Sequence, residues 1–249
     1  MRVTFAVVLP FLLSLACGRA EAAVGSQFNV ATPGGNVLVE GFASSSGAAR
    51  PAVIILSGSH GFAPPAYDEL GRSFNAAGLD AYLVHLLSPA DQQAITRAGS
   101  APARIAYYAT RWQDWIAMVR GVVSYLDSQP RYAGKVGVLG ISLGAQAAAV
   151  ASADRRDIGA LVLVDGGFPD GYSQPVRSLP PLYMVWGSAD RVFPVATARQ
   201  LQRMAQGLGG SVSLNVYQGG AHNFFLKSGP QAAAAHQGAA DFFLSRLSK

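Results

Sequence analysis

The chain has 249 residues, of which 50% are hydrophobic and 13% are charged. This composition can bury a large core, and α/β folds of this length commonly form one domain. The formal net charge of +5 comes from scattered arginines and lysines, and Arg155 and Arg156 are the only adjacent basic residues. Without a basic cluster, nucleic acid is not expected as a partner.

The first 22 residues have the pattern of a secretory signal peptide. Met1 and Arg2 precede an apolar run at 3–16, and Ala20-Glu21-Ala22 supplies a small-x-small cleavage site. We therefore expect a secreted or periplasmic mature chain, 23–249, that forms a single domain. The apolar run is too short and too close to the N-terminus to predict a membrane span.

Cleavage after Ala22 would remove Cys17, the only cysteine of the chain. A mature chain without thiols excludes a cysteine nucleophile, a disulfide framework and a cysteine-based zinc site. The alternative is a bacterial lipoprotein anchored at Cys17. Ser14 stands where such processing sites usually have an aliphatic residue, which disfavours this alternative.

Predicted strands and helices alternate along most of the chain. Residues 27–31 and 36–41 predict a hairpin across a Pro-Gly-Gly turn, and later apolar runs predict strands that are buried on both faces. The alternation predicts an α/β fold: a mainly parallel central sheet with helices on both faces and its ligand site at the carboxyl ends of the strands. We expect these strands at 51–56, 81–85, 135–141, 159–164, 181–186 and 212–217, and helices at 66–77, 112–126, 194–207 and 231–247, with an alanine-rich helix after 144.

Residues 86–110 contain no clear strand and mix small, polar and proline residues. A long loop in a compact domain is often functional, so we expect a lid or a pocket wall here. Trp112 and Trp115 follow at the start of a predicted helix. Their spacing matches the aliphatic stripe of that helix, which favours core packing over a ligand platform.

The segment Gly140-Ile141-Ser142-Leu143-Gly144 is a G-x-S-x-G pattern between a predicted strand and a predicted helix. A serine on such a tight turn needs neighbours without Cβ atoms, and the two glycines supply them. Ser142 would then project above the sheet as a nucleophile. It needs a base, a group that orients the base, and hydrogen-bond donors for an oxyanion.

The best candidates for base and acid follow in the order serine, acid, histidine. His222 lies in the glycine-rich loop after the strand at 212–217, and Asp190 lies in the loop after the strand at 181–186. Asp165, at the end of the preceding strand, is the rival acid. Aspartate also favours turn and capping positions, which is the alternative interpretation of Asp165.

The oxyanion donors are expected to be backbone amides. The N–H of Leu143 directly follows the nucleophile, and a second N–H should come from the loop after the strand at 51–56. We favour Ser59 for the second donor, with Gly58 as the alternative. The sequence indicates the loop but not which amide points inward.

The remaining histidines do not have a metal-ligand spacing, so no metal is expected. His60 lies in the predicted oxyanion loop and His85 ends a strand, so either can line the pocket or make ordinary hydrogen bonds. His236 lies in the last predicted helix and is expected to be structural or exposed.

These motifs resemble those of the dienelactone hydrolase family of α/β-hydrolases. The resemblance rests on the loop 56–62, the turn 140–144, the acid loop 186–194 and the histidine loop 219–224, and it covers roughly residues 50–245. It implies an α/β-hydrolase fold and an enzyme without a cofactor. Typical members have a cysteine nucleophile and a glutamate in the loop after the third strand, where this chain has Ser142 and Gly58.

We therefore expect a serine esterase that cleaves a small carboxylic ester or lactone through an acyl-enzyme. Ser142 would attack the carbonyl, His222 would remove the serine proton, and Asp190 would orient the imidazole. Two alternatives remain open: a peptidase or amidase on the same fold, and a binding protein that keeps the fold without catalysis. The sequence does not indicate the oligomeric state.

Overall fold

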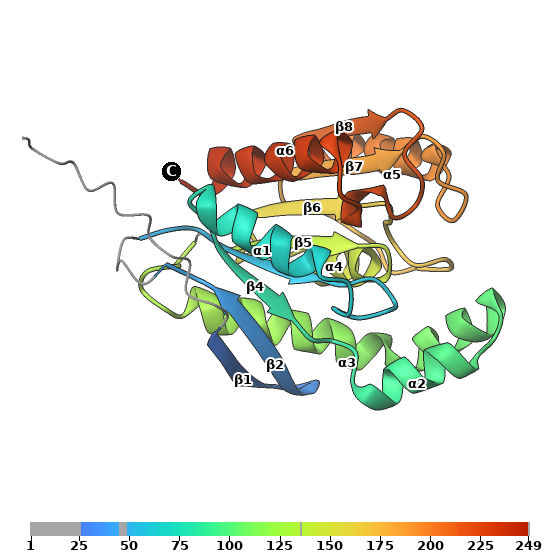
Figure 1. Cartoon of the computed structure of the whole chain (residues 1–249), viewed down its shortest axis with the longest axis horizontal. Helices are drawn as coiled ribbons and strands as arrows, with labels where there is room; N and C mark the ends of the chain where they lie inside the picture. The colour runs from blue at the N-terminus through green and yellow to red at the C-terminus, as the bar shows by residue number, and fades with distance from the viewer. Residues whose placement is uncertain (1–25, 45–48, 135, 249) are drawn as a thin grey trace, which may run out of the picture.

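The computed structural model describes residues 26–44, 49–134 and 136–248. The predicted signal peptide, its cleavage site and Cys17 lie outside these residues. The described residues contain a sheet of eight strands (Figure 1). The strands are β1 (Ser26–Thr32), β2 (Gly35–Phe42), β3 (Ala52–Leu56), β4 (Asp80–Val84), β5 (Val136–Ile141), β6 (Ala160–Val164), β7 (Leu182–Gly187) and β8 (Val212–Tyr217).

The sheet has the order β1-β2-β4-β3-β5-β6-β7-β8. β2 pairs antiparallel with both β1 and β4, and every later pair is parallel. β3 to β7 are buried along their whole length, because helices cover both of their faces. The prediction of a mainly parallel sheet with a hairpin at its start is confirmed. Most strand ends differ from the predicted ones by one residue.

The helices are arranged in two layers around the sheet. They are α1 (Ala66–Ala76), α2 (Pro89–Arg97), α3 (Ala101–Asp127), α4 (Leu143–Ser152), α5 (Val195–Gly207) and α6 (Pro230–Leu247), with a short 3₁₀ turn η1 (Phe224–Leu226) before α6. Buried residues of α1 and α6 pack on one face, and those of α3, α4 and α5 pack on the other (Figure 1). In the part of the chain that the structure describes, no helix is both long and apolar enough to cross a membrane.

The two tryptophans at the predicted helix start belong to the core. Trp115 is fully buried, and Trp112 packs edge-on against it with ring centroids 5.5 Å apart. The prediction of core packing for this pair is therefore confirmed.

The prediction of a long loop at 86–110 is wrong, because most of this segment is helical. Ser88 caps α2: its hydroxyl accepts from the Asp91 N–H, and the Asp91 carboxylate accepts from the Ser88 N–H. Ser100 caps α3, which begins at residue 101, well before the expected start at 112. The Ser-Pro-x-Asp capping box was visible in the sequence, but α2 has a weak apolar face and gives little periodic signal.

A buried carboxylate holds α2 and α3 together as a helical hairpin. Asp91 is only 2% exposed, and it accepts hydrogen bonds from Tyr107 (2.6 Å) and Arg111 (2.8 Å) on α3. Burial raises the pKa of Asp91, but the hydrogen bonds from Tyr107, Ser88 and Arg111 outweigh it, so the pKa of this carboxyl lies below its ordinary value. The ionised form therefore stabilises the hairpin.

Replacing Asp91 by Asn should lower the free energy of unfolding by about 1–3 kcal/mol at pH 7, because it removes a buried, charge-assisted acceptor. The contribution of a carboxylate with a lowered pKa is complete above its unfolded pKa of about 3.9 and is lost as the pH falls through the folded value. The gap between variant and wild type in thermal or urea unfolding should therefore shrink in acid.

Asp114→Asn is the matched control, since Asp114 also pairs with Arg111 but is 46% exposed. Its effect should stay within about 1 kcal/mol, as is usual for surface ion pairs. Equal losses from both substitutions would contradict the role assigned to Asp91.

Candidate active site

Ser142 occupies a strained turn between β5 and α4. Its backbone has φ 56° and ψ −113°, in the left-handed half of conformational space that side chains rarely adopt. A Cβ on Gly140 would collide with the backbone of Gly144, and a Cβ on Gly144 would collide with the backbone of Leu56. Both glycines are therefore required by close backbone contacts, as the sequence pattern predicts.

Ser142, His222 and Asp190 form a continuous hydrogen-bonded chain. The Ser142 Oγ lies 2.9 Å from His222 Nε2, and His222 Nδ1 lies 2.9 Å from Asp190 Oδ2. A carboxylate only accepts, so Nδ1 carries the proton and Nε2 of a neutral imidazole accepts from the serine hydroxyl. The other oxygen of Asp190 accepts from the Val192 and Phe193 amides at 2.7 and 2.9 Å, which fixes the carboxylate.

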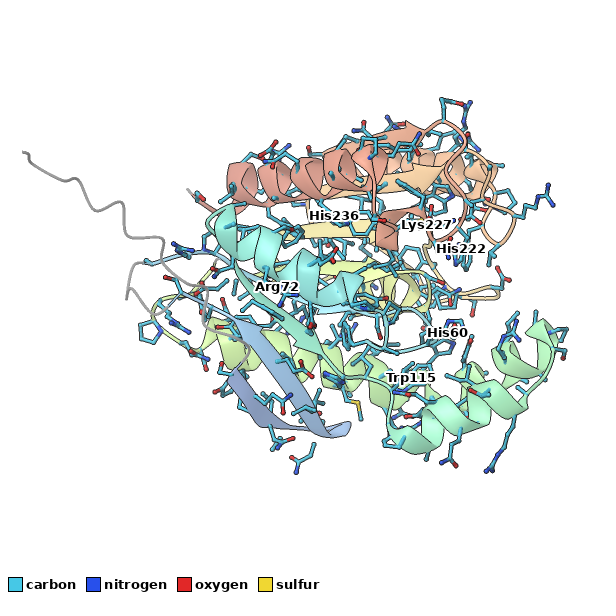
Figure 2. The ribbon with its side chains drawn as sticks, viewed as in Figure 1. His60, Arg72, Trp115, His222, Lys227 and His236 are labelled. Carbon is cyan, nitrogen blue, oxygen red and sulfur yellow. The ribbon has the colours of Figure 1, made fainter. Side chains whose placement is uncertain are left out.

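The parallel sheet brings these three groups together from distant parts of the sequence. Asp190 follows β7, and His222 lies between β8 and η1. The Ala189 N–H donates to the Gly220 carbonyl at 2.8 Å, which joins the two loops. Figure 2 shows His222 and His60 at the same end of the sheet, toward which the strand arrows point.

Asp165, the rival acid, ends β6 and does not bond to His222. It is fully buried, and its Oδ1 accepts from the Gly187 N–H at 2.9 Å, in line with the alternative that it caps a turn. Burial, together with the charge of Asp190, raises the pKa of Asp165 to about 8 against the opposing effect of the Gly187 hydrogen bond. Asp190 is therefore the acid that contacts the histidine in this structure.

Two backbone amides are available near Ser142. Leu143 is the first residue of α4, so its N–H has no acceptor within the helix. The Gly58 N–H is engaged, because it donates to the Tyr67 hydroxyl at 2.9 Å. Among the described residues none accepts from the Ser59 N–H, so the geometry favours Ser59 over Gly58 as the second donor.

A cavity of about 730 Å³ opens beside Ser142. The loops after β3, β7 and β8 line it together with the Ser142 turn, and most of the lining area is apolar. His60 and Arg191 contribute polar edges, and Tyr67 contributes its buried ring. A larger hollow of about 970 Å³ is lined mainly by α3 and contains none of these residues.

The other two histidines lie outside this cavity. His85 Nε2 pairs with Glu40 at 2.8 Å, and its ring contacts Phe62 with centroids 4.8 Å apart, so the suggestion that it lines the pocket is wrong. The His236 ring lies 2.7 Å from the Phe225 carbonyl, and burial lowers the pKa of His236. His236 is a structural residue, as expected.

The α2–α3 hairpin does not line the cavity, which corrects the expectation of a lid or pocket wall at 86–110. It supports the neighbouring loop from outside. The Gln92 amide lies so close to Gly61 that a Cβ there would come within 2.9 Å of it, and the Tyr108 hydroxyl interacts with the Ser59 side chain.

Sequence patterns did not reveal Tyr67 or Arg191 as site residues. Tyr67 belongs to the buried stripe of α1, and nothing in its spacing indicates that its hydroxyl binds the Gly58 amide. Arg191 directly follows the acid, and only the loop geometry directs it to the cavity.

Asp165, Asp190 and His222 together offer side-chain atoms that could bind a metal, all within 4.8 Å of one another. The Asp190 and His222 atoms already hydrogen-bond to each other, and the raised pKa of Asp165 favours its protonated form at neutral pH. This arrangement suits proton transfer better than metal binding, which needs deprotonated ligands.

A family model described as the dienelactone hydrolase family matches residues 39–246. The chain belongs to this family. Membership supports esterase-like hydrolysis, and it agrees with the resemblance that the four sequence motifs indicated. No curated protein matches the sequence.

Solved structures of related folds superpose well on this family member. A dienelactone hydrolase from Anabaena variabilis has a TM-score of 0.69 and 20% identity, covering 90% of this chain and 99% of its own. Est1E from Butyrivibrio proteoclasticus has a TM-score of 0.66 and 13% identity, with coverages of 90% and 99%. XC6422 from Xanthomonas campestris, an α/β serine hydrolase without a lid, has a TM-score of 0.63 and 16% identity, with coverages of 90% and 95%. The predicted α/β-hydrolase fold is confirmed.

Replacing Gly144 by Ala should destabilise the protein by about 3 kcal/mol or more, because the new methyl group would meet rigid backbone instead of a flexible side chain. Gly207→Ala is the control: Gly207 is the exposed last residue of α5, and a Cβ there meets nothing within 4 Å. Thermal unfolding should show a neutral or slightly stabilised control. A stable Gly144→Ala protein would show that the close contact can relax.

Proposed function

We propose that this protein is a serine hydrolase that cleaves a small carboxylic ester or lactone through an acyl-enzyme. The observation that carries the proposal is the pair of 2.9 Å hydrogen bonds that link Ser142 through His222 to Asp190. A serine hydroxyl is a weak nucleophile until a base removes its proton, and this chain of contacts supplies the base and its orienting acid.

In the acylation step, the Ser142 Oγ attacks the carbonyl carbon while His222 Nε2 takes the hydroxyl proton. The negative charge that develops on the carbonyl oxygen is stabilised by the N–H groups of Leu143 and Ser59. Asp190 stabilises the imidazolium. The tetrahedral intermediate then collapses, and the departing alkoxide leaves as an alcohol with the proton of His222.

In the deacylation step, water attacks the acyl group on Ser142 and gives a proton to His222. Collapse of the second tetrahedral intermediate releases the carboxylic acid and returns the proton to the Ser142 Oγ. A lactone follows the same steps, and its alcohol and acid remain on one molecule. Besides the substrate and this water, the steps use side chains and backbone amides of the protein.

Two observations support an ester substrate of modest size. The cavity beside Ser142 has about 730 Å³ and a mainly apolar lining, which suits a small neutral acyl or alkyl group. Several proteins of similar structure are described as esterases, including one from Pyrobaculum calidifontis. The hydrogen-bonded chain of Ser142, His222 and Asp190 and the cavity beside it are compatible with both esters and lactones.

Replacing Ser142 by Ala should lower kcat/KM for a short p-nitrophenyl ester by several orders of magnitude, since the three residues act as a unit. A fluorophosphonate probe should label the wild type on Ser142 and leave the variant unlabelled by mass spectrometry. Wild-type turnover by Ser142→Ala would refute the assignment. Binding of esters without turnover or labelling would favour the non-catalytic alternative.

Replacing Tyr67 by Phe should lower kcat about tenfold with little change in KM, because the Gly58 amide loses its acceptor and the oxyanion loop loses its alignment. Burial raises the pKa of Tyr67 to about 12, so its neutral hydroxyl is present throughout the assay range. Tyr125→Phe, at an exposed position on α3, should have no effect. An unchanged kcat in Tyr67→Phe would show that the loop is held without this bond.

A further inference from the structure

Asp165 has features that a turn-capping role does not require. Its Oδ1 accepts from the Gly187 N–H, but its Oδ2 is buried and has no partner among the described residues. Leaving a buried carboxyl oxygen unpaired costs free energy, and a serine or asparagine could accept the same amide bond.

The unpaired carboxyl lies beside the groups that serve Ser142. Atoms of Asp165, Asp190 and His222 all fall within 4.8 Å of one another. The position follows from the sheet: β6 and β7 are parallel neighbours, and Val164 pairs with Val185 just before the two acid loops begin. Asp165 therefore lies close to His222, at the carboxyl end of the strand next to the one that precedes Asp190.

We propose that Asp165 is a reserve acid, a positioning residue that can orient His222 in place of Asp190. This inference rests on the proposed serine hydrolase function. In the intact protein the His222 Nδ1–H donates to Asp190, and Asp165 does not bond to the histidine. When the Asp190 carboxylate is removed, the imidazole turns toward the free Oδ2 of Asp165, which accepts the Nδ1–H and stabilises the imidazolium.

The electrostatics of the cluster fit this division of roles. Among the acidic, histidine and cysteine side chains of the described residues, Asp190 and His222 are grouped with Asp165 within 4.8 Å, and Asp190 is the charge that acts on it. Burial disfavours the ionised form of Asp165, and the nearby Asp190 carboxylate disfavours it further, so the pKa of Asp165 is raised to about 8 against the opposing effect of the Gly187 hydrogen bond. Loss of the Asp190 charge lowers the pKa of Asp165 and makes its ionised form available.

The test is a double-mutant cycle at the two acids, with kcat/KM for a short p-nitrophenyl ester as the readout. Asp165→Asn alone should stay within about threefold of wild type, because asparagine keeps an acceptor for Gly187. Asp190→Ala should lose about 10- to 100-fold, short of the roughly 10⁴-fold loss known for an acid without a replacement. The double variant Asp165→Asn/Asp190→Ala should reach that full loss.

A pH profile separates orientation of the histidine from a structural effect. The activity that Asp190→Ala retains should rise with pH as Asp165 ionises, and the double variant, which keeps His222 but lacks both carboxylates, should not show this rise. If Asp165→Asn lowers activity by the same factor in both backgrounds, Asp165 is only structural and the proposal is overturned. An Asp190→Ala loss of about 10⁴-fold would overturn it too.

Asp190→Ala also removes the acceptor for the Val192 and Phe193 amides, so its loop can unfold. Circular dichroism shows whether the alanine variant is folded. If it is not, Asp190→Ser takes its place in the cycle, because the serine hydroxyl can accept a hydrogen bond from one of these amides. The rate of fluorophosphonate labelling of Ser142 provides a readout that needs no substrate. If Ser142 is labelled but no ester is turned over, the ester proposal is refuted, and the labelling rates of the acid variants still test Asp165. If the wild type shows neither labelling nor turnover, both proposals are refuted.

Discussion

The site depends on one close backbone contact, where the start of α4 meets the end of β5 and the loop after β3. No side chain fits at Gly140 or Gly144, so the two glycines let the backbone segments touch. At this contact Ser142 has a φ of 56° and lines the same cavity as the loop that carries Ser59. The surrounding core holds Ser142 in this strained conformation.

The sequence contained enough information for the sheet and for three of the site residues. Buried parallel strands are continuous apolar runs, so β3, β5, β6 and β7 were placed almost to the residue. Because all their carboxyl ends lie on one edge, residues that follow them must meet there, and Asp190 and His222 do meet Ser142. Proximity of the three was thus predictable from topology and loop position alone.

The parts that the sequence did not predict depend on contacts between distant segments. Asp91, whose side chain joins α2 to α3, is a charged residue whose burial no local pattern indicates. For His85 the sequence left pocket lining and ordinary hydrogen bonding open, and the pair with Glu40 on the adjacent strand shows the second. The engagement of the Gly58 amide depends on the Tyr67 hydroxyl nine residues later, which only the packing of α1 positions.

The α2–α3 hairpin touches the oxyanion loop through Gln92 and Tyr108, but it contributes nothing to the lining of the cavity or to the chain of proton transfer. The second half of α3, from Trp115 onward, belongs to the core, whereas α2 and the first turns of α3 support the loop from outside the site. The length and sequence of this outer part can therefore vary, by evolution or by engineering, while the reacting atoms stay where the sheet places them. Such changes would alter how far the loop leans over the pocket, and hence which substrates fit, without rebuilding the chemistry.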